Sequence, residues 1–220
     1  MPFLKRAVAI DPDFALGHAW LALALTITFV LEMNKRYLDE ASAAAQRALV
    51  LDGSDATAHW ASAMVMMWSG LYDQAGSHFD RAIALNPADI QIRADRANLL
   101  RYSGRFGEAL AAIDDALKQG AFAPHWFWQV RGEILFDLKR YGEAVAAFDN
   151  LPEKGLMAHI YLAAAHVYLG DEANATKAVS AARQFRPGLR VRDLNIVKPH
   201  ANRTALDHLL EGLRKAALPE

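Results

Sequence analysis

The chain has 220 residues, of which 53% are hydrophobic and 22% are charged, so it can build a core and is not a disordered polypeptide. Its 24 Lys and Arg nearly balance its 25 Asp and Glu, which argues against a general binder of nucleic acids or anionic membranes. The absence of cysteine excludes disulfide scaffolds, thiol catalysis and cysteine-ligated metal centres. A cysteine-free composition also fits a reducing compartment, and we expect a cytoplasmic protein.

The chain opens with a short amphipathic segment, Leu4 to Pro12, and continues with a stretch without formal charge, Phe14 to Leu31. The length of this stretch is close to the lower limit for a helix that spans a bilayer. Because Gly17 and His18 interrupt the stretch and a repeat pattern follows it, we interpret it as a helix buried between neighbours. We therefore predict no membrane partner.

From residue 39 onward one pattern returns at a nearly constant spacing. Two glycines, Gly70 and Gly104, stand one period apart, and an aromatic residue follows each of them two positions later. The small residue at the centre of the pattern is always alanine, and successive copies are separated by roughly 34 residues. The five alanines are Ala41, Ala75, Ala109, Ala144 and Ala175.

This pattern resembles the tetratricopeptide repeat (TPR) family, whose period is about 34 residues. The resemblance covers about residues 3 to 188. It implies an all-α, right-handed solenoid of about five helix-turn-helix repeats after an N-terminal half repeat, with a concave groove lined by the first helices. The sequence departs from the pattern between Leu25 and Ala41, where about seven extra residues lengthen the first full repeat, and near Leu151, where the fourth repeat ends early.

Helix boundaries follow from the turn residues. Gly70, Gly104 and Gly170 are placed to end first helices, and Pro87 and Pro187 are placed to follow second helices. The predicted first helices are 15–31, 56–69, 89–103, 125–138 and 156–169, and the predicted second helices are 36–51, 72–85, 106–119, 141–149 and 172–185.

The tail leaves the repeat period. Residues 188–202 hold Pro199 and scattered apolar residues, so we predict an extended segment there. Leucines at helical spacing then predict an amphipathic helix over 204–216, which begins near Thr204 and carries a Glu211–Lys215 pair. We expect this helix to cap the exposed face of the last repeat. The domain prediction is a TPR array over 1–188, then a linker and a capping helix over 189–220.

No sequence motif for catalysis is present, and we predict no enzyme activity, no catalytic residue, no metal site and no cofactor. His159 and His166 share one helical face, but a zinc site needs further converging ligands. Glu133 and Asp137 also share a face, and their basic neighbours favour a solvated surface over a catalytic pair. The basic residues between Arg183 and Arg203 lack interleaved aromatic residues, so we predict no nucleic-acid binding.

By alignment of the repeats, one set of first-helix residues faces the groove. Asn98 and Arg101 resemble part of the clamp with which some TPR proteins hold a peptide carboxylate, but the preceding helix supplies no matching Asn or Lys. We expect Trp60→Ala or Arg101→Ala to weaken partner capture while helicity stays unchanged. The candidate binding residues for a peptide or protein are Trp60, Met64, Met67, Gln91, Asn98, Arg101, Tyr102, Trp126, Gln129 and Glu133.

These patterns predict a non-catalytic protein-protein interaction module, a scaffold whose groove holds a peptide, a second copy, or the chain's own tail. An alternative comes from residues 210–220, which resemble the C-terminal ending of proteobacterial regulators. In those proteins a TPR array follows a class III adenylate cyclase domain or a winged-helix domain. Because the first repeat is only a half repeat, we expect a C-terminal piece of a longer bacterial protein, with a regulatory role toward an upstream domain.

Overall fold

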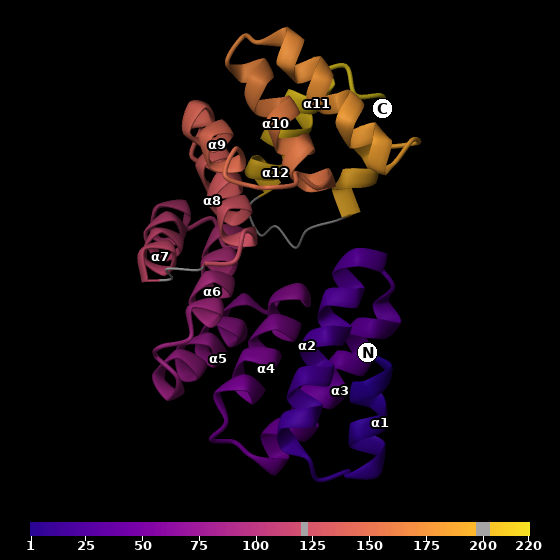
Figure 1. Ribbon diagram of the computed structural model, residues 1–220, viewed down its shortest axis with the longest axis vertical. Coiled ribbons are helices and arrows are strands. Elements are labelled where there is room, and N and C mark those ends of the chain that lie inside the picture. The colour runs from indigo at the N-terminus through magenta and orange to yellow at the C-terminus, as the bar shows by residue number, and fades with distance from the viewer. Residues whose placement is uncertain (120–122, 197–202) are drawn as a thin grey trace. The chain divides into compact units, whose positions relative to one another are not determined.

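A computed structural model describes residues 1–119, 123–196 and 203–220 (Figure 1). These parts of the chain form twelve α-helices and one 3-10 helix, and they contain no strand, which confirms the all-α prediction. The first helices of the repeats are α2 (Ala15–Glu32), α4 (Ala56–Trp68), α6 (Ile90–Tyr102), α8 (Trp126–Asp137) and α10 (Leu156–Tyr168). The second helices are α1 (Pro2–Ile10), α3 (Lys35–Leu51), α5 (Tyr72–Leu85), α7 (Phe106–Gln119), α9 (Tyr141–Phe148) and α11 (Glu172–Phe185).

Left-handed residues end most of the first helices. Gly70, Gly104 and Gly170 have φ angles of 78°, 79° and 77°, a backbone conformation that costs glycine little because it has no Cβ atom. Lys139 takes the equivalent place in the fourth repeat with a φ of 61°. These turns reverse the chain within a few residues, and α2, α4, α8 and α10 each pack against the second helix that follows them.

The chain divides into two compact units, Met1–Leu99 and Leu100–Glu220. In the first unit α2 packs against both α3 and α4, and in the second unit α10 packs against α9 and α11. The boundary lies inside α6. The sequence-based division after residue 188 concerns a different boundary, the end of the repeat array, and it stays a prediction.

The repeated alanines lie where helices approach most closely. Their exposed fractions lie between 0% and 2%, although they belong to five different second helices. A side chain at such a position must be small because the neighbouring helix leaves no room for more atoms. The five residues are Ala41, Ala75, Ala109, Ala144 and Ala175.

The tail is more ordered near its start than predicted. Val191–Ile196 forms a 3-10 helix, η1, instead of an extended segment. The Asp193 carboxylate accepts a hydrogen bond from the Arg190 backbone N–H at 3.0 Å, and the Val191 N–H donates to the Pro219 carbonyl at 2.7 Å. The rest of the predicted extended segment, 197–202, lies outside the described residues. Helix α12 (Arg203–Lys215) then follows close to its predicted bounds.

Replacing Ala75 with leucine should destabilise the protein by about 1–3 kcal/mol, because the added atoms have no space between the helices. The matched control is Ala84→Leu on the exposed side of the same helix, which should change stability little. Urea denaturation followed by circular dichroism measures both. Equal stability of the two variants would contradict the close approach of helices at Ala75.

Candidate functional site

The candidate residues of the first helices, here called the inner stripe, differ widely in exposure. In the first unit Trp60 and Met67 are buried, Met64 and Asn98 are half-buried, and Gln91 is exposed. In the second unit Arg101, Tyr102 and Glu133 are buried, while Trp126 and Gln129 are half-buried. Half of the predicted binding residues are therefore inaccessible to a partner in this conformation.

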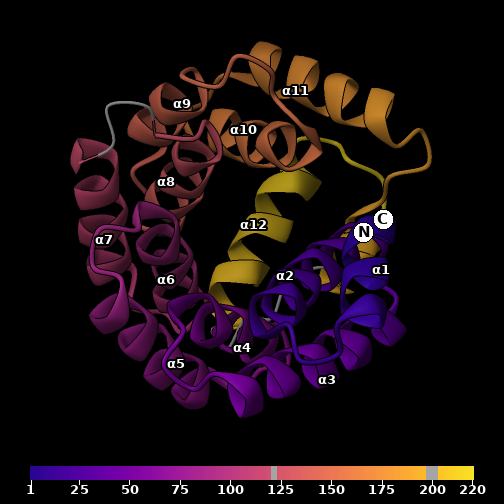
Figure 2. The same ribbon diagram turned by 60° about the horizontal axis from the view of Figure 1, so that its bottom comes forward.

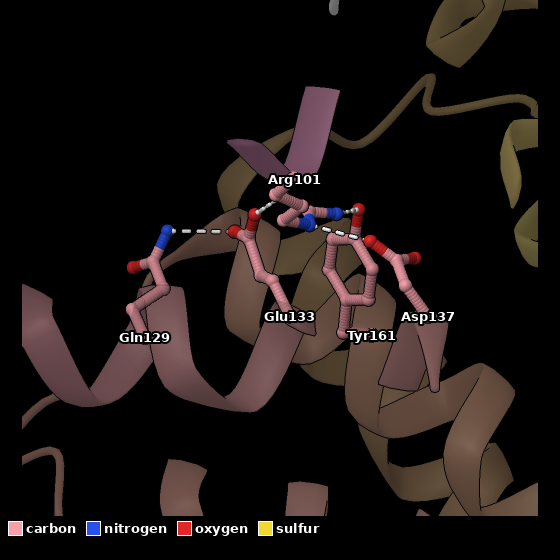
Figure 3. Close-up of polar contacts among 5 residues, drawn as sticks. All are labelled: Arg101, Gln129, Glu133, Asp137 and Tyr161. Carbon is pink, nitrogen blue, oxygen red and sulfur yellow. Dashed lines mark hydrogen bonds and ion pairs between the residues drawn. The ribbon is translucent and has the colours of Figure 1, made fainter. Parts of the chain in front are cut away.

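Arg101 is the centre of a buried ionic cluster in the second unit (Figure 3). Its guanidinium pairs with Glu133 and with Asp137, where the Nε–Oδ2 distance is 2.5 Å, and donates to the Tyr161 hydroxyl at 2.5 Å. Gln129 donates to the other oxygen of Glu133 at 3.1 Å. The side chains of Arg101, Glu133 and Asp137 are only 0%, 4% and 2% exposed, so the charges are removed from water together.

This cluster corrects two expectations. Glu133 and Asp137 do not form a solvated surface, because both side chains turn inward to Arg101. Arg101 does not face an open groove as predicted, because its guanidinium is buried and donates to Glu133, Asp137 and Tyr161. Sequence reasoning missed the pairing because the partners of Arg101 lie 32, 36 and 60 residues after it in the chain.

The protonation states follow from this arrangement. Burial alone would lower the pKa of Arg101, but Asp137, Tyr161 and Glu133 together raise it well above its usual value. Burial raises the pKa of Tyr161 well above its usual value, so its hydroxyl stays neutral and accepts from Arg101. The cluster is a structural element with its charges compensated inside the protein.

Arg101→Ala should destabilise the protein by about 3–5 kcal/mol, because it removes the buried cation that pairs with two buried carboxylates. This replaces the expectation from the sequence that the variant only weakens binding. The control is Arg140→Ala, which removes an ion pair with Glu143 that is about half exposed and should change stability little. Urea midpoints for the two variants measure the difference, and similar midpoints would contradict a structural role for Arg101.

In the second unit the tail helix covers the inner side of α10. Helix α12 packs against α10, on the side away from α11 (Figure 2). Gly212 of α12 lies so close that an added Cβ would come within 2.8 Å of the Ala164 Cβ atom and 2.9 Å of the Tyr168 ring. The His208 ring stacks on Tyr168 at 4.3 Å and bonds to the Tyr141 hydroxyl at 2.7 Å. The chain's own tail thus covers one side of α10, the first helix of the last repeat.

In the first unit the inner stripe stays partly open. The indole N–H of Trp60 donates to Asp95 Oδ2 at 2.9 Å, and the rings of Trp60 and Trp20 form a T-shaped pair with a centroid distance of 5.9 Å. Trp20 is 45% exposed, whereas Trp60 and Asp95 are each 8% exposed. Neither Trp20 nor Asp95 was among the predicted residues.

The positions of Trp20 and Asp95 in their repeats could have identified them from the sequence. Trp20 lies eight residues after Pro12, and Asp95 lies eight residues after Pro87, so both occupy the same position in their repeats. Trp60 lies one position earlier in its own repeat, seven residues after Gly53, which stands in place of the proline. Trp60 therefore contacts one of these residues on each neighbouring first helix because the repeats stack in register.

Burial raises the pKa of Asp95 to about 7, and the Trp60 hydrogen bond only partly opposes this change. The unfolded chain loses this proton near pH 3.8, so between about pH 4 and 7 the folded protein binds more protons than the unfolded one. The contribution of Asp95 to stability therefore falls as pH rises through this window, and it is lowest above pH 7.

Asp95→Asn should stabilise the protein at pH 8 by on the order of 2–4 kcal/mol and give no such gain at pH 4, because asparagine carries no charge and still accepts from Trp60. Thermal unfolding of both proteins across this range measures the effect. A constant difference between wild type and variant at all pH values would contradict a raised pKa at this carboxyl group.

Other polar groups offer little chemistry. Among the described residues no group of three or more His, Cys, Asp or Glu side chains is placed to hold a metal ion. His59 and His78 approach each other with their Nδ1 atoms 3.0 Å apart, and burial lowers the pKa of His78. Two nitrogens alone do not complete a zinc site.

One helix has membrane-like length and composition. By these two criteria α2 is long and apolar enough to cross a bilayer, and 39% of its 18-residue window is buried inside the protein. The core helix of a folded protein satisfies the same criteria.

Comparison of the sequence with family profiles and with curated proteins gave no match. Among solved structures, YrrB, described as a TPR protein with an unusual peptide-binding site, is similar over 94% of this chain and 97% of its own, with 17% identity and a TM-score of 0.54. PilW, a type IV pilus biogenesis factor, is similar over 90% and 89%, with 19% identity and a TM-score of 0.66. The APC/C hetero-tetramer Cut9–Hcn1 has a chain similar over 96% of this protein and 39% of its own, with 17% identity and a TM-score of 0.73.

These comparisons confirm the TPR fold of the chain, and at such identities they establish the fold alone. The resemblance of residues 210–220 to cyclase-linked and winged-helix regulators stays a prediction.

Proposed function

We propose that the protein is a non-catalytic interaction module that binds a peptide or protein segment on the inner side of its first unit, along α2 and α4. The observation that carries the proposal is an exposed apolar stripe on α2. Leu16, Trp20, Ile27 and Leu31 are 39%, 45%, 56% and 76% exposed. Their spacings of four, seven and four residues place them on one face of the helix.

A contiguous apolar face is a property of interaction surfaces, whereas single exposed apolar residues are common on any protein. Tryptophan is among the residues that contribute most to binding when a partner covers them. Trp20 also touches Trp60, so the stripe connects to the inner stripe of α4. We infer that a partner contacts both helices.

The same stripe has an alternative explanation in insertion of α2 into a membrane. The opposite face of α2 argues for a protein partner, since Ala19, Ala22 and Leu25 are fully or almost fully buried in contact with the rest of the unit. Insertion would expose that face to lipid and break the packing with α3 and α4. A partner that covers only the exposed face leaves this core intact.

The second unit offers less surface for a partner. Helix α12 already covers the inner side of α10, and the donors of Arg101 are engaged within its cluster. Trp126 and Gln129 remain half-buried, and we keep them as secondary candidates.

The structural neighbours support an interaction role by analogy. YrrB is described with a peptide-binding site, and Cut9 forms a complex with Hcn1. The TPR fold hosts different ligands on the same scaffold, so the analogy extends to the class of function and not to a particular ligand.

Trp20→Ser should weaken binding of peptides selected against the wild-type protein by about tenfold or more, because a central aromatic contact is lost. Peptides from a random displayed library provide the ligands, and fluorescence anisotropy measures their dissociation constants. The control is Val50→Ser on α3, whose side chain is 71% exposed and lies outside the stripe. Unchanged affinity of the Trp20 variant for every selected peptide would contradict the proposed surface.

A further inference from the structure

Three acidic side chains are buried in the described parts of the chain, and they differ in one respect. Glu133 and Asp137 each pair with Arg101, so their charges are compensated. Asp95 has Trp60 as its hydrogen-bond donor, and no basic side chain of the described residues forms an ion pair with it. A buried carboxylate without a cation costs free energy, so proteins rarely keep one without a use for it.

The position of Asp95 links it to the apolar stripe. The Asp95 carboxyl group accepts the N–H of the Trp60 indole, and the Trp60 ring forms a T-shaped contact with Trp20, which is 45% exposed. Trp60 therefore contacts both a buried carboxyl group and a partly exposed indole ring. One carboxyl oxygen of Asp95, Oδ1, is left without a donor by the hydrogen bonds of the described residues.

We infer that the first unit binds a lysine or arginine side chain of its partner, with the cationic group paired to Asp95 and lying against the indole of Trp20. The inference rests on the proposed function, because it names the chemistry of the segment that the inner surface takes. Cations bind the faces of tryptophan rings better than those of other aromatic residues, and a charge-assisted hydrogen bond to a carboxylate adds to that attraction.

The charge of the unit favours the same ligand. Residues 1–99 carry eight Lys and Arg against eleven Asp and Glu, a net charge of −3, whereas the whole chain has a net charge of −1. A basic segment is attracted by this excess, and an acidic segment is repelled. The raised pKa of Asp95 agrees with a carboxyl group whose natural counter-charge is supplied from outside the chain.

The test uses four acetylated and amidated peptides, Ala-Leu-Xaa-Leu-Ala, in which Xaa is lysine, arginine, norleucine or glutamate. The full-length protein is labelled with ¹⁵N, and the indole N–H signals of Trp20 and Trp60 are assigned by substitution and followed during titration. We expect the lysine and arginine peptides to shift both signals and to bind about tenfold more tightly than the norleucine peptide. The glutamate peptide should bind most weakly.

Asp95→Asn should abolish the preference for lysine and arginine while the norleucine peptide binds as before. The control Asp73→Asn removes the same charge from an exposed position on α5 and should keep the preference. Trp20→Leu, at a partly exposed site, is a second and independent variant that should also reduce the preference.

The outcomes separate the inference from the proposed function. Equal binding of all four peptides at the Trp20 signal would overturn the cation site and leave the apolar binding surface in place. A preference that persists in Asp95→Asn and Trp20→Leu would also overturn it. If no peptide shifts either signal, the cation site is refuted, and the library selection on the unmodified protein still decides the proposed function.

Discussion

Every helix pair in this chain is too small to bury its own apolar face, and the rest of the structure depends on that constraint. A pair becomes stable only when the next pair covers it, and two pairs come close enough only where the residue at the crossing is small. The buried alanines at a nearly constant spacing meet this requirement, and four of the five, Ala75 among them, have an exposed fraction of 0%. Once the pairs stack in register, equivalent positions of different repeats become neighbours in space.

That register brings two charged residues of α6 into contact with side chains of neighbouring first helices. Asp95 and Arg101 lie on the same helix, and both are buried. Arg101 meets two carboxylates and a tyrosine hydroxyl from other helices of its unit, so its charge serves stability. Asp95 meets an indole N–H and no basic group among the described residues, and we infer that a ligand supplies its counter-charge. The two residues show that a buried charge indicates a binding site only when its partners have been accounted for.

The tail gives the two units different roles. In the second unit the close approach of Gly212 to Ala164 and the stacking of His208 on Tyr168 hold α12 against α10. In the first unit an exposed apolar face on α2 lies next to Trp60. We therefore regard the second unit as the stabilised end of the array and the first as its binding surface.

The sequence by itself determined the fold class and almost every helix. The bounds of α5, α7 and α11 are those predicted, and the other first and second helices of the full repeats differ by one residue at either end, because period, glycine turns and amphipathic faces are local properties. The tertiary structure alone decided which inner residues are accessible. Arg101 and Glu133 were predicted as binding residues on the basis of helical position. In the folded chain these two side chains, 32 residues apart in the sequence, form a buried ion pair with each other. Trp20 and Asp95 were overlooked because their relation exists only through Trp60. Helical periodicity predicts on which face of a helix a side chain lies. Whether that side chain contacts water, another side chain or a ligand depends on the helices packed around it.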